Sequence, residues 1–210
     1  MTHSPLPRRL AAVLAAAAAV TALGACAPIV VGGAMVGSAL MVTDRRTSGA
    51  QVEDQAIELK GVNRAREIVG DRGHINITSY NRQVLLTGEV PSDADKAAIE
   101  QNVARIENVR SIVNELGVMG ASSLTSRSND TILTSKVKAS FVDAKDIFAN
   151  AFKVVTERGT VYLMGRVTER EATRAADLTR SIAGVQKVVR VFEILTEAEL
   201  ADLQPKPAPK

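Results

Sequence analysis

The feature that most constrains the fold of this chain is an internal duplication. Residues 75–90 align with residues 152–167 at an offset of 77, and apolar residues and glycines coincide along both segments. After a one-residue deletion the match continues to the end of each copy. The coincident pairs are Val84 and Val161, Leu86 and Leu163, Gly88 and Gly165, Val90 and Val167, Ile106 and Ile182, Val109 and Val185, and Val113 and Val189. Because so many pairs share one register, two copies of one domain explain the sequence better than chance does.

Each copy has the pattern of a β-hairpin followed by a helix and a further strand. Polar turns at residues 80–82 and 158–159 separate runs of alternating apolar residues, which is typical of hairpins. Helices are predicted to start at Ser92 and at Thr168, where Glu171 completes a capping box, and to run to about Arg105 and Ile182. Last strands are expected near 109–118 and 185–195. A helical crossover joins each to its hairpin, so this pairing should be parallel.

A further helix is expected before each hairpin. In the second copy Ser128 or Asn129 can cap it, and its apolar stripe is Leu133, Val137 and Phe141. In the first copy the counterpart covers about 52–69, although Gly61 is unfavourable inside a helix.

We therefore predict an α+β fold of two tandem αββαβ domains, each with two helices on one face of a three-stranded mixed sheet. The domains are expected at 51–118 and 128–196, with a linker at 119–127.

The first 25 residues have the pattern of a lipoprotein signal peptide. Arg8 and Arg9 precede an Ala- and Leu-rich run that is too short for a stable membrane-spanning helix. The run ends in Leu23-Gly-Ala-Cys26, which resembles a bacterial lipobox. Cys26 is therefore the expected lipidation site, carrying a diacylglycerol and a further acyl chain such as palmitate, which hold the protein in a membrane. Ala27, in place of an Asp, favours the periplasmic face of the outer membrane.

The two ends of the mature chain are expected to lie outside the domains. Residues 26–50 comprise the lipidated Cys26 and a Gly-rich tether, whose apolar part (27–42) either lies along the bilayer surface or forms a small-residue helix that packs on a partner. Residues 197–210 end in Pro-Lys-Pro-Ala-Pro-Lys and are predicted to be a disordered tail.

Composition argues against several classes of function. Aromatic residues make up 3% of the chain and Trp is absent, which disfavours base stacking on nucleic acid. One Cys and two His do not form a cluster of metal ligands, so we expect no metal and no cofactor. His74 is predicted to be a solvated loop residue. The cap explains Glu171, so no catalytic residue is expected and the protein is predicted not to be an enzyme; a hydrolase using Glu169 or Glu171 is a remote alternative.

The two copies differ in charge. Residues 51–118 hold 8 basic and 11 acidic residues, a balance of −3, whereas residues 128–196 hold 11 and 8, a balance of +3. Only the second copy would be attracted to an acidic surface.

These patterns resemble the BON-domain family, whose repeat carries Val-x-Leu-x-Gly-x-Val in the hairpin and a Gly-Val turn before the last strand. Here those motifs are residues 84–90, residues 161–167 and Gly184-Val185. The closer resemblance is to dual BON-domain lipoproteins of the outer membrane, which associate with division sites and preserve envelope integrity. The stretches that carry it are Gly49–Asp54, Ser128–Thr131 and Leu163–Ala172.

The resemblance implies that the second domain binds anionic phospholipids through its first helix, and that the first domain does not. The lipid-binding residues expected there are Ile132, Lys136, Lys138, Phe141 and Val142. Ile132 stands where the family has Trp, so it can only insert as a hydrophobe. From the residues alone, the lysines are either a basic rim around an apolar wedge or a solvated face.

Two further expectations concern structure and partners. Gly88 and Gly165 interrupt strands and are interpreted as structural, because a strand glycine marks a bulge or a close backbone approach. The alternative function is a protein-interaction scaffold, for example beside the β-barrel assembly machinery, suggested by the Gly-rich tether and the acidic first copy.

Overall fold

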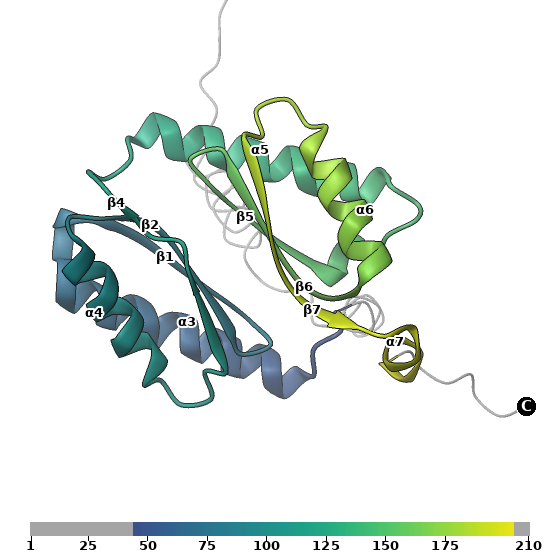
Figure 1. Ribbon diagram of the computed structural model, residues 1–210, viewed down its shortest axis with the longest axis horizontal. Coiled ribbons are helices and arrows are strands. Elements are labelled where there is room, and N and C mark those ends of the chain that lie inside the picture. Colours follow the sequence, from purple (N-terminus) through teal and green to yellow (C-terminus); the bar gives the residue numbers. More distant parts are fainter. Residues whose placement is uncertain (1–43, 204–210) are drawn as a thin grey trace, which may run out of the picture. The chain divides into compact units, whose positions relative to one another are not determined.

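The first copy forms a mixed sheet covered by two helices (Figure 1). In this computed structural model, residues 44–203 are described; the predicted signal peptide, Cys26 and the apolar part of the tether lie outside them. The elements are α3 (Ser48–Val69), the short 3-10 helix η2 (Gly70–Arg72), β1 (His74–Tyr80), β2 (Gln83–Val90), α4 (Asp93–Ala104), β3 (Ser111–Asn114) and β4 (Gly117–Val118). Strand β1 is antiparallel to β2, whereas β3 and β4 are parallel to it.

The second copy repeats this arrangement. Its elements are α5 (Leu124–Asp143), η3 (Ala149–Ala151), β5 (Phe152–Glu157), β6 (Thr160–Thr168), α6 (Glu169–Arg180), β7 (Lys187–Leu195) and α7 (Glu197–Leu203). Strand order is β5-β6-β7, with β7 parallel to β6. Helices α5 and α6 both lie on one face of this sheet (Figure 1). The predicted α+β fold with two αββαβ copies is confirmed.

The first copy departs from three strands because its last strand is broken. Strands β3 and β4 both pair with β2, and Glu115 and Leu116 lie between them. Leu116 is 2% exposed and packs in the first core, while the side chain of Asn114 accepts a hydrogen bond from the Leu116 amide. Leu116 packs into the core and does not pair with β2, so the predicted strand 109–118 is divided into β3 and β4.

The first helix of each copy starts earlier than predicted. Thr47 caps α3 by accepting a hydrogen bond from the Ala50 amide, and Ser123 caps α5 by accepting one from the Ser126 amide. Residues 124–127, predicted to be linker, are therefore helical. The sequence between 122 and 131 holds several Ser, Thr and Asn residues that can all cap a helix, so the prediction of Ser128 or Asn129 was wrong.

The predicted disordered tail is also wrong in its first part, because residues 197–203 form α7. Thr196 accepts a hydrogen bond from the Glu199 amide, and the Glu199 carboxylate accepts one from the Thr196 amide. This reciprocal pair of hydrogen bonds provides acceptors for two backbone amides at the start of the helix. Leu200 is buried and holds the helix to the domain.

The two copies use equivalent positions of their first helices to build their cores. Leu133, Val137 and Phe141 are buried on α5, as predicted from their spacing. The residues 76 positions earlier, Ile57, Gly61 and Ala65, are buried on α3. A Cβ at Gly61 would lie 3.0 Å from Cδ1 of Ile77, so glycine lets α3 lie close to β1.

The two strand glycines each sit where a side chain does not fit. Gly88 has a φ of +109°, and a Cβ there would collide with the carbonyl oxygen of His74. A Cβ at Gly165 would collide with the carbonyl oxygen of Ala151. In both copies the neighbouring backbone therefore approaches the hairpin strand closely.

A third core joins the two copies through the sheet faces that the helices leave free. Its buried members are Tyr80 and Leu85 from the first copy and Tyr162, Met164 and Val191 from the second. Hydrogen bonds from Asn76 to Glu157 (2.8 Å) and from Asn81 to Glu193 (2.6 Å) lie beside it. The domains therefore share an apolar interface in addition to their own cores.

Candidate functional site

The residues predicted to contact lipid all lie on helix α5. The helical repeat places the exposed ones in two separate stripes. Ile132, Lys136, Lys138 and Val142 are exposed, and the two apolar side chains are 52% and 72% exposed. Positions four apart lie on the same side of a helix, whereas positions two apart do not. Ile132 and Lys136 therefore form one stripe, Lys138 and Val142 form another, and the buried stripe runs between them.

Phe141 is the exception among the predicted residues. Its side chain is 1% exposed, and its ring lies 5.2 Å from the ring of Phe152 in the second core. Ala144 and Ile147, from the segment that follows α5, belong to the same core. Phe141 is a core residue, and its burial argues against the prediction that it contacts lipid.

Two surface hollows flank α5, and each contains one of the stripes. The first, which we call the Ile132 groove, has a volume of about 590 Å³, and both Lys136 and Arg158 line it with Ile132. The second, the Val142 hollow, has a volume of about 400 Å³ and is lined by Lys138 and Val142 together with Asp44. Each hollow thus combines an exposed apolar side chain with a cation.

The segment that enters the first domain is held beside the Val142 hollow. Arg45 donates two hydrogen bonds of 2.7 Å to the Glu171 carboxylate and a third, of 2.9 Å, to the carbonyl of Arg166. Both charged side chains are almost fully buried. Burial alone would raise the pKa of Glu171, but Arg45 and the Thr168 amide together lower it. The chain therefore enters the fold through a charge-paired contact with the second domain.

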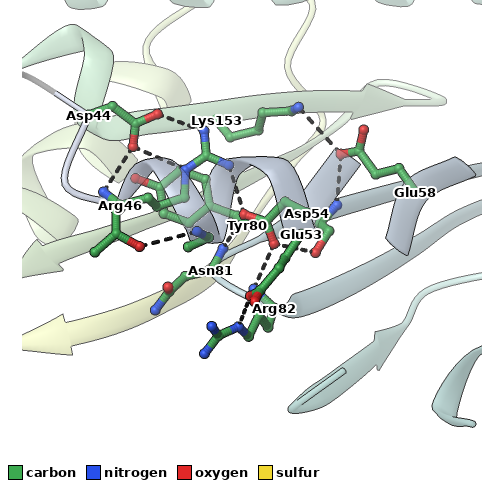
Figure 2. A network of polar contacts seen from close by, with 12 residues as sticks. Asp44, Arg46, Glu53, Asp54, Glu58, Tyr80, Asn81, Arg82 and Lys153 are labelled. Atoms are coloured by element: carbon green, nitrogen blue, oxygen red, sulfur yellow. Dashed lines mark hydrogen bonds and ion pairs between the residues drawn. The ribbon is translucent and has the colours of Figure 1, made fainter. Parts of the chain in front are cut away.

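The next residue ties the same segment to the first domain, as Figure 2 shows. The Arg46 guanidinium donates hydrogen bonds to Asp44 and Asp54 and lies 4.2 Å from the centre of the Tyr80 ring. Burial raises the pKa of the Tyr80 hydroxyl, since the charged form loses its hydration there. Residues 44–46 are thus anchored to both domains.

Sequence reasoning missed a pair of aspartates that hold the hairpins. Asp54, 2% exposed, accepts hydrogen bonds from the amides of Asn81 and Arg82 at 2.8 and 2.7 Å (Figure 2). Asp130 does the same for Arg158 and Gly159. These turn residues have positive φ values, as in a type I′ turn, and they lie beyond the last paired residues of the two strands. The signal was an Asp inside each predicted first helix, 76 residues apart.

His74 and the two glutamates considered for catalysis lie in other surroundings than predicted. His74 is the first residue of β1 and is half-buried between Glu89 and Glu157, so the prediction of a solvated loop residue is wrong. Glu169 pairs with Arg190 at 2.6 Å, and Glu171 pairs with Arg45. Both carboxylates that had suggested a hydrolase therefore have structural partners.

No helix within residues 44–203 is both long and apolar enough to cross a membrane.

Comparison with known proteins decides the family. The family model for the BON domain matches residues 60–120 and 129–196, together more than half of the chain. The chain belongs to the BON-domain family. Each match starts inside a first helix, so α3 and α5 extend beyond the N-terminal limits of the matched BON domains.

Three relatives match half or more of the chain. Outer membrane lipoprotein DolP of Haemophilus influenzae is 38% identical over 93% of this chain and is covered over its full length. The 21 kDa hemolysin of Actinobacillus pleuropneumoniae is 30% identical over 71% of the chain and 78% of that protein. Osmotically-inducible protein Y of Escherichia coli is 28% identical over 54% of the chain and 58% of that protein.

Proposed function

We propose that this protein is an outer-membrane lipoprotein, anchored through Cys26, that binds anionic phospholipids through α5 of its second BON domain and thereby supports envelope integrity. The observation that carries the proposal is the pairing, on the exposed side of α5, of an apolar side chain with a lysine in each of two stripes. The similarity to Outer membrane lipoprotein DolP supports the compartment.

The charges favour this helix over its counterpart in the first domain. The second copy has a balance of +3 and the first a balance of −3. At the position of Ile132 the first domain has Ala56, and at the position of Val142 it has Arg66. Helix α3 therefore lacks the apolar residue of each stripe, and the surrounding charge would repel an anionic surface.

Anchoring makes a weak surface contact sufficient. Cys26 precedes Asp44 by 18 residues, so the chain between them reaches at most about 60 Å. Asp44 itself lines the Val142 hollow. A bilayer that holds acyl chains on Cys26 would stay within reach of α5, and each lysine near the surface contributes only about 1 kcal/mol.

Vesicle flotation of the mature chain with Cys26→Ala tests the headgroup contact without the anchor. We expect binding to vesicles with anionic lipid, little binding to neutral ones, and loss of binding at high salt. Lys136→Glu with Lys138→Glu should weaken binding about thirtyfold or more, since two attractive charges of ~1 kcal/mol each are removed and reversed.

The matched control places the same charge change on the equivalent helix of the first domain. Lys60→Glu with Arg66→Glu alters two exposed cations on α3 and changes the net charge by the same amount. This variant should bind nearly as well as the parent. Equal binding to neutral and anionic vesicles, or equal losses in the two double variants, would contradict the proposal.

A scaffold function is the second candidate, and an exposed apolar pair on α3 favours it. Val52 and Leu59, seven residues apart and so on one side of the helix, are each 66% exposed. A protein partner, such as an outer-membrane assembly protein, would cover them. A photocrosslinker at Leu59 in intact cells should then capture a partner protein. Leu59→Asp should prevent that protein from associating. Capture of lipid alone would refute this candidate.

A further inference from the structure

A cluster of one imidazole and two carboxylates lies where the two domains meet. His74 Nδ1 is 3.7 Å from Oε2 of Glu89 and 3.9 Å from Oε1 of Glu157. His74 begins β1, Glu89 is near the end of β2, and Glu157 ends β5, so both domains contribute. One ligand atom from each of the three residues lies within 4.8 Å of the other two.

The cluster is buried and only partly satisfied. Glu89 is fully buried and the side chain of Glu157 is 6% exposed. Among the described residues, Nδ1 of His74 and Oε1 of Glu89 are buried atoms without a hydrogen-bond partner. The nearest cation to that Glu89 oxygen is the Arg158 guanidinium, at 3.8 Å on a side chain that is about half exposed. The two buried carboxylates, Glu89 and Glu157, therefore have little positive charge close by to offset their own.

The remaining contacts of the cluster orient it. Asn76 donates a hydrogen bond of 2.8 Å to Oε2 of Glu157, which leaves Oε1 directed to His74. The Ser122 amide donates one of 3.0 Å to Oε2 of Glu89. Groups that hold a ligand from behind in this way are typical of metal sites.

The two carboxylates and the imidazole are the kinds of ligand that a divalent cation binds. A neutral imidazole offers a lone pair, and a divalent cation would offset both carboxylates.

We propose that His74, Glu89 and Glu157 form a binding site for a divalent transition metal of the zinc class, which links the two BON domains. One nitrogen and two oxygen ligands suit Zn²⁺, and water can occupy a fourth position. Ligand atoms of a tetrahedral zinc lie about 3.3 Å apart, so the three side chains must close by roughly 0.5–1.5 Å. A hollow of about 250 Å³, lined by His74 and Glu157, gives the ion a path of entry.

Titration of the mature acylated chain in detergent with Zn²⁺ tests this site. We expect one ion per chain by calorimetry and a higher melting temperature in its presence. The chain has two histidines, and His3 falls in the predicted signal peptide, so the single imidazole of the mature protein should shift in its NMR spectrum at stoichiometric zinc.

Variants separate a built site from surface binding. His74→Gln and Glu157→Gln should each weaken zinc binding at least tenfold, and Asn76→Ala, which removes no ligand, should weaken it about tenfold or more. Glu107→Gln, which removes an exposed carboxylate outside the cluster, should leave it unchanged. Sub-stoichiometric binding, an unshifted imidazole, or equal affinity in His74→Gln and Glu107→Gln would overturn the proposal. The melting curve of each variant shows whether it is folded, so a misfolded variant is recognised. Asn76→Ala in addition keeps all three ligands.

Discussion

Asp130 occupies in α5 the position that Asp54 occupies in α3, and each carboxylate accepts hydrogen bonds from two consecutive amides of the adjacent hairpin turn. The pair explains why the stretches that carry the family resemblance in the two first helices both contain an Asp. It also links each first helix to its sheet by a polar contact as well as by apolar packing. The duplication has therefore retained a specific hydrogen-bond arrangement.

Replacing these aspartates should destabilise the domains unequally. Asp54→Ala leaves two turn amides, the Ser79 hydroxyl and Arg46 without their buried acceptor, and we expect a loss of about 3 kcal/mol in the free energy of unfolding. Asp130→Ala should cost about 2 kcal/mol, because Asp130 accepts hydrogen bonds from the amides of Arg158 and Gly159. Urea denaturation measures both. Asp71→Ala, an exposed position, serves as the control and should change stability little.

The ion pair between Arg45 and Glu171 should make stability depend on acid pH. The folded-state pKa of Glu171 is lowered, so its contribution is complete above the ordinary glutamate pKa and is lost as the pH falls through the folded value. Glu171→Gln should lower the free energy of unfolding by about 2 kcal/mol at neutral pH, and the difference from the parent should shrink below the ordinary pKa. Arg45→Ala should give the same convergence.

The control for this pH dependence is Glu169→Gln. The pKa of Glu169 is also lowered, by its hydrogen bond from Arg190, but that carboxylate is exposed and solvent screens the pair. Parallel stability curves for Glu171→Gln and the parent down to acid pH would show that the Arg45 pair does not control acid unfolding.

Phe141 allows the corrected role of α5 to be tested. Phe141→Ala opens a cavity in the second core and should cost about 3–5 kcal/mol, measured by urea denaturation. Val142→Ala, at the neighbouring and 72% exposed position, should change stability by less than about 0.5 kcal/mol. On vesicles the order should reverse: folded Phe141→Ala should bind like the parent, and Val142→Ala should bind more weakly. A lipid-binding loss confined to folded Phe141→Ala would restore the original prediction.

Local patterns predicted the fold well, and contacts between distant residues account for most of what they missed. Alternating apolar residues predicted the hairpins, and the spacing of Leu133, Val137 and Phe141 predicted the buried face of α5. The surroundings of His74 depend on Glu157, 83 positions away and in the other domain, and no local pattern contains that information. The helix starts were missed for a different reason, since several adjacent residues compete to cap α5.

The arrangement of the exposed α5 residues in the candidate site follows from their spacing in the sequence. Lys136 and Lys138 are two residues apart, and helical geometry alone places them on different sides of α5. Helical spacing therefore excludes a single basic rim that contains both lysines. It instead predicts two separate pairs, Ile132 with Lys136 and Lys138 with Val142. The hollows beside them could not be predicted, because Arg158 and Gln186 come from the β5–β6 turn and the α6–β7 loop.

The last prediction concerns Ile132, which stands where the family resemblance expects Trp. Ile132→Trp should strengthen binding to anionic vesicles by roughly fivefold, because an indole combines an apolar body with an N–H that can stay hydrated at the headgroup boundary. Ala56→Trp is the matched control, since Ala56 is exposed at the equivalent position of α3 in the acidic first domain. Flotation should show a gain for Ile132→Trp alone, and Trp fluorescence should shift to shorter wavelength on vesicles only in that variant. An equal gain in both variants would mean that any exposed indole binds the bilayer and that α5 has no special place in lipid contact.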